Sequence, residues 1–150
     1  MKKIDISPSP RILRMLGQIE FEPWRCFAEL IDNSLDAFKN NSSGVQFVEV
    51  TLPSSKDSSY SNAEITIFDN GCGMTEEQMQ SSLRAGWSGN DPIDKLGLFG
   101  MGFNIATARL AKKTKIKTTT FDSKNWIIAE IDFLELERNK SFKIPLITIP

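Results

Sequence analysis

The chain has 150 residues, of which 40% are hydrophobic and 25% charged, and its formal net charge is -1. These values predict one globular domain with a sizeable core, exclude a disordered or fibrous protein, and give no general attraction to nucleic acids or membranes. The chain has no histidine and only two cysteines, so it lacks the commonest general base, and neither a disulfide framework nor a zinc site is expected. No stretch resembles a signal peptide or a membrane span, and we expect a reducing compartment, the cytoplasm or, in a eukaryote, the nucleus.

Two helices are the first predicted elements. After the extended SPSP, the segment RILRMLGQIEF predicts a short helix, and helical spacing continues from about Glu22 to Asn40. At about 100° per residue, Glu29, Asn33 and Asp36 share one face of the second helix. This helix therefore brings three polar side chains together. The opposite, apolar face consists of Phe27, Leu30, Ile31, Leu35 and Phe38.

A strand pair and a third helix follow. VQFVEVTL (residues 45–52) and AEITIFDNGCGM (residues 63–74) are rich in strand-forming residues and flank a serine-rich loop. They predict an antiparallel hairpin whose second strand ends at Asp69. TEEQMQSSLRA then begins with Thr75 as N-cap and Gln78 three residues later, which is the pattern of a capping box.

The remaining segments predict a loop, a helix and up to three strands. Residues 87–95 contain glycine and proline without periodicity and indicate a mobile loop, and GLFGMGF then leads into a helix, NIATARLA. KTKIKTTTF and NWIIAEIDF predict a strand pair joined by a turn at residues 122–125, and the prolines of SFKIPLITIP favour an edge strand. This order predicts an α+β fold, a two-layer α/β sandwich with helices on one face of a mixed, largely antiparallel sheet.

The segment DNGCGM is the first glycine-rich stretch. Asp69 ends a predicted strand, and Gly71 and Gly73 allow a tight turn with positive φ and a close approach of a flat ligand to the backbone. A plain strand-to-helix turn explains the same residues. The motif alone leaves both interpretations open.

The segment GLFGMGF is the second glycine-rich stretch. Gly97, Gly100 and Gly102 precede a helix and form a backbone surface without side chains beside the positive end of the helix dipole, which suits a polyphosphate. The spacing G-x-x-G-x-G differs from the dinucleotide fingerprint, and the sequence contains no P-loop motif. The alternative is a glycine-rich loop that only packs.

The polar face of the second helix completes this group of motifs. The side-chain oxygen of Asn33 can ligate Mg²⁺, which prefers few protein ligands together with phosphates and water. Glu29, one turn earlier, could orient or deprotonate a water molecule. Read as structure only, Glu29 and Asp36 are solvated residues of an exposed helix face.

In this order, ELIDNSLDA, DNGCGM and GLFGMGF resemble the nucleotide-binding motifs of the GHKL (Bergerat-fold) ATPase superfamily. This superfamily includes the gyrase B subunit, the ninety-kilodalton heat-shock chaperone, sensor histidine kinases and MutL proteins. The motifs extend from about Phe27 to Ala111. They look most similar to the chaperone, MutL and Morc-like members. Histidine kinases usually lack the glutamate of this helix, and this chain has no histidine to phosphorylate.

The resemblance implies a role for each matching residue. Glu29 would activate the attacking water, Asn33 would hold Mg²⁺ against the phosphates, and Asp69 would recognise the adenine amino group. Residues 87–95 correspond to the ATP lid, from which Lys95 could reach a phosphate, although a solvated lysine is the favoured interpretation. The other implied nucleotide-binding positions are Asp36, Ala37, Gly71, Gly73, Met74, Gly97, Gly100, Met101, Gly102 and Phe103.

The resemblance also implies an activity and a domain organisation. We expect residues 1–150 to be a single ATP-binding domain that binds ATP with Mg²⁺ and hydrolyses it slowly, as a switch of conformation or of homodimerisation. The Gly-Thr pair and the transducer lysine of many members have no counterpart after Phe103, so we expect the amino-terminal part of a longer protein or an unusually small member. A non-catalytic nucleotide sensor is the alternative. The basic run from Arg109 to Lys117 could touch nucleic acid, although a solvated helix end and strand start is the favoured interpretation.

Overall fold

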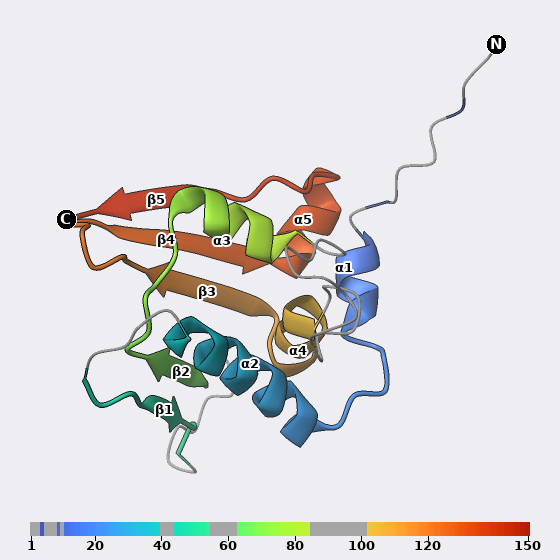
Figure 1. Cartoon of the computed structure of the whole chain (residues 1–150). Coiled ribbons are helices and arrows are strands. Elements are labelled where there is room, and N and C mark those ends of the chain that lie inside the picture. Colours follow the sequence, from blue (N-terminus) through green and yellow to red (C-terminus); the bar gives the residue numbers. More distant parts are fainter. Residues whose placement is uncertain (1–3, 5–8, 10, 40–43, 55–62, 85–101) are drawn as a thin grey trace.

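The computed structural model describes residues 4, 9, 11–39, 44–54, 63–84 and 102–150. Helices and strands follow one another along the chain in an order typical of an α+β protein (Figure 1). The elements are α1 (Arg11–Leu16), α2 (Pro23–Phe38), β1 (Val48–Thr51), β2 (Thr66–Asp69), α3 (Glu76–Leu83), α4 (Gly102–Leu110), β3 (Lys113–Thr118), β4 (Trp126–Asp132), α5 (Phe133–Asn139) and β5 (Leu146–Ile149).

The strands of the described residues form two antiparallel sheets, one of β1 and β2 and one in the order β3-β4-β5. In Figure 1, α2 lies in front of β2 and α3 in front of β4, so both helices lie on the same side of these sheets. The predicted two-layer α+β sandwich is therefore confirmed, with its sheet layer divided into two parts. The predicted hairpin is also confirmed, because Val48 pairs with Asp69, the last residue of β2. β5 lies at a sheet edge, as its flanking prolines indicated.

Helix α2 begins with Pro23 in its first turn, where a missing N–H costs no hydrogen bond. Its buried residues are Cys26, Ser34 and Phe38, and it packs against α4 and β2. Leu35, which the wheel assigned to the apolar face, is 49% exposed, so this assignment is wrong. Cys26 is on the buried side of α2, which packs against α4, and Leu35 lies about 180° around the helix from it. Leu35 therefore points away from α4.

Helix α5 was not predicted from the sequence. Asp132 is its N-cap, and its Oδ1 accepts hydrogen bonds from the N–H groups of Leu134 and Glu135, both at 3.0 Å. The helix ends at Asn139, and its C-cap residue, Lys140, has a φ of 47°. The sequence signal was therefore an aspartate that ends a strand and caps the next helix.

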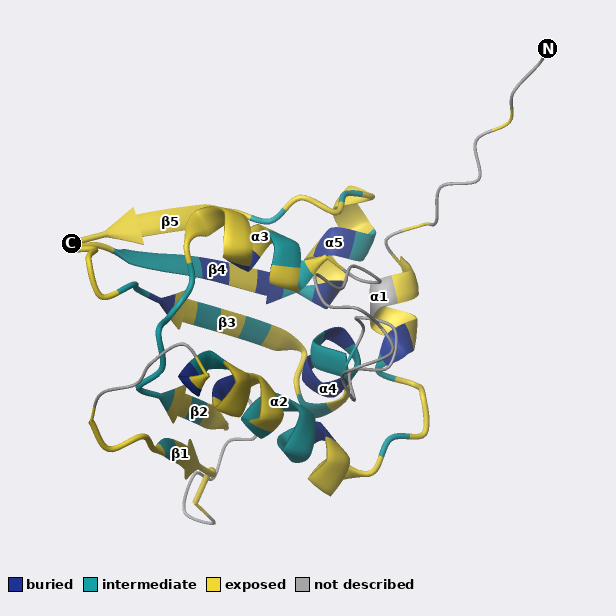
Figure 2. Ribbon diagram, in the orientation of Figure 1, coloured by how far each residue is buried: buried dark blue, intermediate teal, exposed yellow. Residues whose placement is uncertain are grey.

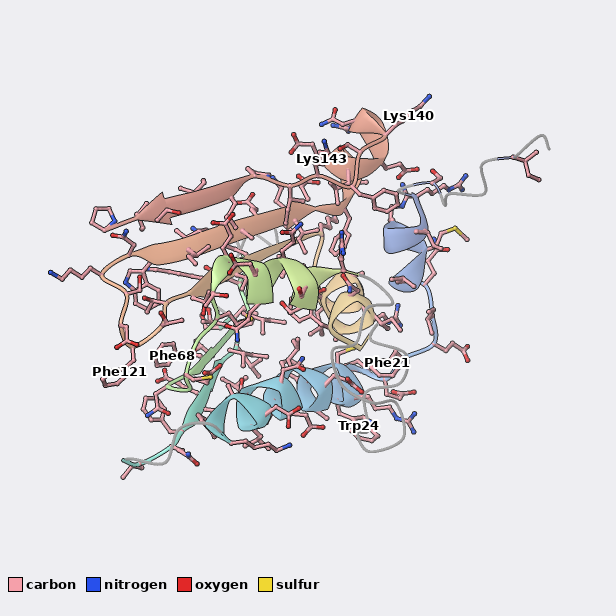
Figure 3. All side chains as sticks on the ribbon, turned by 45° about the horizontal axis from the view of Figure 1, so that its top comes forward. Phe21, Trp24, Phe68, Phe121, Lys140 and Lys143 are labelled. Carbon is pink, nitrogen blue, oxygen red and sulfur yellow. The ribbon has the colours of Figure 1, made fainter. Side chains whose placement is uncertain are left out.

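The main core cluster consists of Ile131, Phe133 and Leu136, from β4 and α5. Phe103 of α4 and Leu83 of α3 pack against it. Figure 2 shows buried residues where β4, α4 and α5 meet, whereas β5 is exposed along its length. This core fixes the direction of α4, which carries the end of the second glycine-rich stretch.

Helix α3 begins with the predicted capping box. Thr75 Oγ1 accepts from the Gln78 N–H at 3.3 Å, and the Thr75 N–H donates to Gln78 Oε1 at 2.8 Å. Among the described helices, none is both long and apolar enough to cross a bilayer.

Candidate functional site

Helix α2 carries the polar residues of the candidate site along its length. Glu29 is half-buried, whereas Asn33 and Asp36 are exposed. Asp36 forms an ion pair with Lys39 at the C-terminal end of the same helix. At about 1.5 Å of rise per residue, Asn33 lies about 6 Å beyond Glu29, and Ala37 about 12 Å beyond it. The helix therefore positions groups over a length that suits an extended ligand.

The Glu29 carboxylate lies directly against Gly102, the first residue of α4. A Cβ atom built on Gly102 would overlap Glu29 Oε2 and would lie 3.0 Å from Glu29 Cδ. Only glycine leaves room for the carboxylate in its present position. The structure thus brings together one residue from the acidic helix and one from the second glycine-rich stretch.

The surroundings of Glu29 favour its protonated form. Burial raises the pKa of the Glu29 carboxyl above its ordinary value, and the negative charge of Asp32, three residues along α2, raises it further. A carboxylate with a raised pKa is a better proton acceptor at neutral pH than an exposed one. This environment suits a residue that takes a proton from water.

Asp69 and Gly71 form the other end of the site. Gly71 donates its N–H to Asp69 Oδ1 at 2.9 Å, which fixes the carboxylate at the end of β2. A Cβ atom on Gly71 would lie 2.7 Å from Ala37 Cβ. Because Gly71 has no side chain, the turn after β2 can approach α2 closely. Asp69 and Ala37 therefore lie beside the same turn.

The second half of DNGCGM is held by the end of β3. Gly73 has a φ of 66°, as the turn prediction required, and a Cβ atom there would overlap the backbone of Thr119. The Met74 N–H donates to the buried Thr118 Oγ1 at 2.9 Å. Sequence reasoning missed Thr118, because a threonine inside a predicted strand gives no sign that it contacts a turn 44 residues away.

The second glycine-rich stretch is described only from Gly102 onward. Gly102 faces Glu29, as above, and the Phe103 side chain packs against the core cluster. The predicted positions Lys95, Gly97, Gly100 and Met101, and the predicted lid at residues 87–95, lie outside the described residues.

Apart from this site, a hollow of about 220 Å³ lies between α1, the α4–β3 connection and the start of α5. It is lined by Arg14, Ala108, Ala111, Lys112, Phe133 and Leu134, and by none of the predicted site residues. Arg14 is already paired with Glu137 at 2.6 Å. We therefore place the candidate site at α2 and the glycine turns.

The basic run from Arg109 to Lys117 is divided by the structure. Lys113, Lys115 and Lys117 are exposed on alternate positions of β3. Lys113 pairs with Asp132 at 2.9 Å, an interaction that raises the pKa of the lysine and lowers the pKa of the carboxyl. The Lys117 ammonium lies 4.4 Å from the centre of the Trp126 ring. Two of the three lysines thus already have partners in the protein.

The described residues contain no group of three or more histidine, cysteine, aspartate or glutamate side chains that could hold a metal ion. A cation bound here by few protein ligands and by substrate phosphates needs no such group. Asn33 is suitably placed, because it is exposed and lies one turn from Glu29.

Residues 21–149 match the family model described as histidine kinase-, DNA gyrase B- and HSP90-like ATPase. The chain is 41% identical over 86 residues to Protein MICRORCHIDIA 4 of Arabidopsis thaliana, an alignment that covers 56% of this chain and 10% of that protein. It is 35% identical over 85 residues to Protein MICRORCHIDIA 7 of the same plant, covering 56% and 11% of the two chains. It is 26% identical over 145 residues to mouse (Mus musculus) MORC family CW-type zinc finger protein 3, covering 93% and 14%. The chain thus spans between a tenth and a seventh of the length of these relatives.

Proposed function

Because the chain belongs to the histidine kinase-, DNA gyrase B- and HSP90-like ATPase family, we propose that it binds ATP with Mg²⁺ and hydrolyses it to ADP and phosphate. The nucleotide lies along α2, with adenine at Asp69 and the phosphates at the first turn of α4. The observation that supports this proposal most strongly is the contact between Glu29 and Gly102. It places the half-buried Glu29 carboxylate beside the helix N-terminus at which the phosphates would bind.

Each residue has one task in the proposed reaction. Glu29 accepts the proton of the attacking water through a carboxylate oxygen, and its raised pKa supports this role. The N–H groups at the start of α4 donate to phosphate oxygens and stabilise the charge that develops there. Asn33 would hold Mg²⁺ through its side-chain oxygen, and the metal would neutralise part of the phosphate charge.

Adenine recognition is assigned to the turn after β2. One oxygen of Asp69 already accepts from Gly71, which leaves the other to accept from the adenine amino group. Gly71, Gly73 and Met74 form the floor of this end of the site, and Ala37 borders it from α2. In this proposal, ATP binding and hydrolysis switch the conformation or the dimerisation of the protein, in the cytoplasm or the nucleus.

Two variants test the proposal by calorimetry with ATP, ADP and a non-hydrolysable analogue, with and without Mg²⁺, and by phosphate release. Glu29→Ala should keep ATP binding and lose about 10² to 10⁴-fold in turnover, the usual contribution of a general base. Asp69→Asn keeps an oxygen for the Gly71 N–H but turns an amide donor toward the adenine amino group, so it should lose binding.

Glu49→Ala, on the exposed β1 strand, serves as the control and should change neither property. If Asp69→Asn bound ATP normally, the adenine assignment would be wrong. If the wild-type chain bound ATP but released no phosphate even in a single turnover, the chain would be a nucleotide sensor rather than an ATPase.

A further inference from the structure

Asn104 stands out because its side-chain amide is buried without a partner. It is 2% exposed, and its Nδ2 is the one fully buried side-chain nitrogen or oxygen that lacks a hydrogen bond within the described chain. A buried donor without an acceptor is costly, and such groups in folded proteins call for an explanation. The fold of this chain therefore tolerates an unfavourable group at this position.

Helix geometry predicts that the Asn104 side chain leans toward the N-terminal end of α4. Asn104 is the third residue of α4, within the turn whose N–H groups have no helical acceptor. Side chains in a helix tilt toward its N-terminus, so the third residue covers the first turn. Gln78 shows the same geometry in this protein, because as the third residue of α3 it reaches back to the Thr75 N–H at 2.8 Å.

The chemistry of the unpaired atom indicates its partner. Gln78 reaches back with an oxygen, which accepts from a backbone N–H, whereas the unpaired atom of Asn104 is a donor. A donor cannot pair with the N–H groups of the first turn and requires an acceptor. Glu29 does not supply it, because it contacts Gly102, and Asn104 lies about 200° around the helix from that residue.

We infer that Asn104 is a nucleotide-binding residue whose side-chain NH₂ donates a hydrogen bond to a phosphate oxygen at the N-terminus of α4. This inference rests on the proposed function and adds a side-chain ligand to the N–H groups of the first turn. An amide is suited to this role because it gives a donor to the phosphate without a charge that would need a counter-ion in the ligand-free protein.

The test compares ATP and adenosine binding to wild-type protein, Asn104→Leu and Asn104→Asp, by calorimetry and by NMR titration. Asn104→Leu removes the donor at similar volume and should weaken ATP binding about ten- to a hundred-fold, the usual range for a hydrogen bond to a charged group. Asn104→Asp places a negative charge beside the phosphates and should weaken ATP binding further. Both variants should bind adenosine as the wild type does, since adenosine has no phosphate.

The stability of the ligand-free protein distinguishes a ligand role from a structural one. Asn104→Leu should be at least as stable as the wild type toward urea, because it removes an unsatisfied donor. The control is Thr107→Ala on the same helix, which loses a hydrogen bond to the Phe103 carbonyl at 2.8 Å and should lower stability without a selective effect on ATP.

Unchanged ATP affinity in both Asn104 variants, or equal losses for ATP and adenosine, would overturn the inference. A loss of stability in Asn104→Leu as large as in Thr107→Ala would also overturn it. A wild-type chain that binds adenosine but not ATP would instead refute the proposed function.

Discussion

Replacement of Gly102 by alanine should separate folding from catalysis. A methyl group at this position would overlap Glu29 Oε2, while ordinary contacts begin at about 3.4 Å, so the carboxylate must move by roughly 1 Å. The obstructing atoms are the end of a flexible side chain, and they can move at little cost. Alanine also favours a helix by up to about 1 kcal/mol over glycine. We therefore expect Gly102→Ala to keep or slightly raise the free energy of unfolding.

The same displacement should reduce turnover severely. A misplacement of about 1 Å in a catalytic group can cost on the order of 10²-fold in rate, so we expect about this loss in single-turnover phosphate release. ATP affinity should change far less, because the N–H groups of the first turn remain. Urea unfolding, calorimetry and phosphate release on the same preparation measure the three quantities.

Gly17→Ala is the matched control for this substitution. A Cβ atom there would lie 2.5 Å from the Ala108 backbone oxygen, which cannot move as a side chain does. This variant should lose stability while its remaining folded fraction keeps its turnover. Full turnover in Gly102→Ala would refute the assignment of Glu29 as the base. A loss of stability in Gly102→Ala as large as in Gly17→Ala would refute the argument that the Glu29 side chain moves away from the new methyl group at little cost.

Two further predictions concern stability. Thr75→Ala removes the N-cap of α3 and should lower the free energy of unfolding by about 1 kcal/mol in urea titrations, with no change in ATP affinity. Folding raises the pKa of the Glu29 carboxyl. The protonated carboxyl therefore contributes stability to the folded state at pH values below its ordinary pKa, and this contribution is lost as the pH rises through the raised pKa. Glu29→Gln should therefore be more stable than the wild type at neutral pH and equal to it at acidic pH, as measured by urea unfolding at both pH values.

Local patterns predicted most of the elements. The capping box of α3, the hairpin that ends at Asp69, and the edge position of β5 all follow from residues close together in the sequence. Helix α5 was missed because Asp132 belongs to a strand pattern and also caps the next helix. Leu35 was misassigned because a wheel gives relative angles on α2, and the direction from which α4 covers that helix depends on distant parts of the chain.

The candidate site was predictable as a set of motifs but not as a set of contacts. The sequence suggested that the glycines leave room for a ligand, whereas Gly71, Gly73 and Gly102 each lie against protein atoms. Thr118 and the unpaired amide of Asn104 could not be predicted, because both depend on which segments meet in three dimensions. Local sequence patterns thus selected the candidate residues, and tertiary packing determined their neighbours.

Helix α2 links the two ends of the site mechanically. It touches the turn after β2 through Ala37 and the start of α4 through Glu29, about 12 Å apart along one helix. A slip of α2 by one residue would rotate both groups by about 100° and would remove both contacts together. In the proposed function, adenine recognition and water activation would therefore depend on the same helical register. The close contacts at Gly71 and Gly102 hold this register.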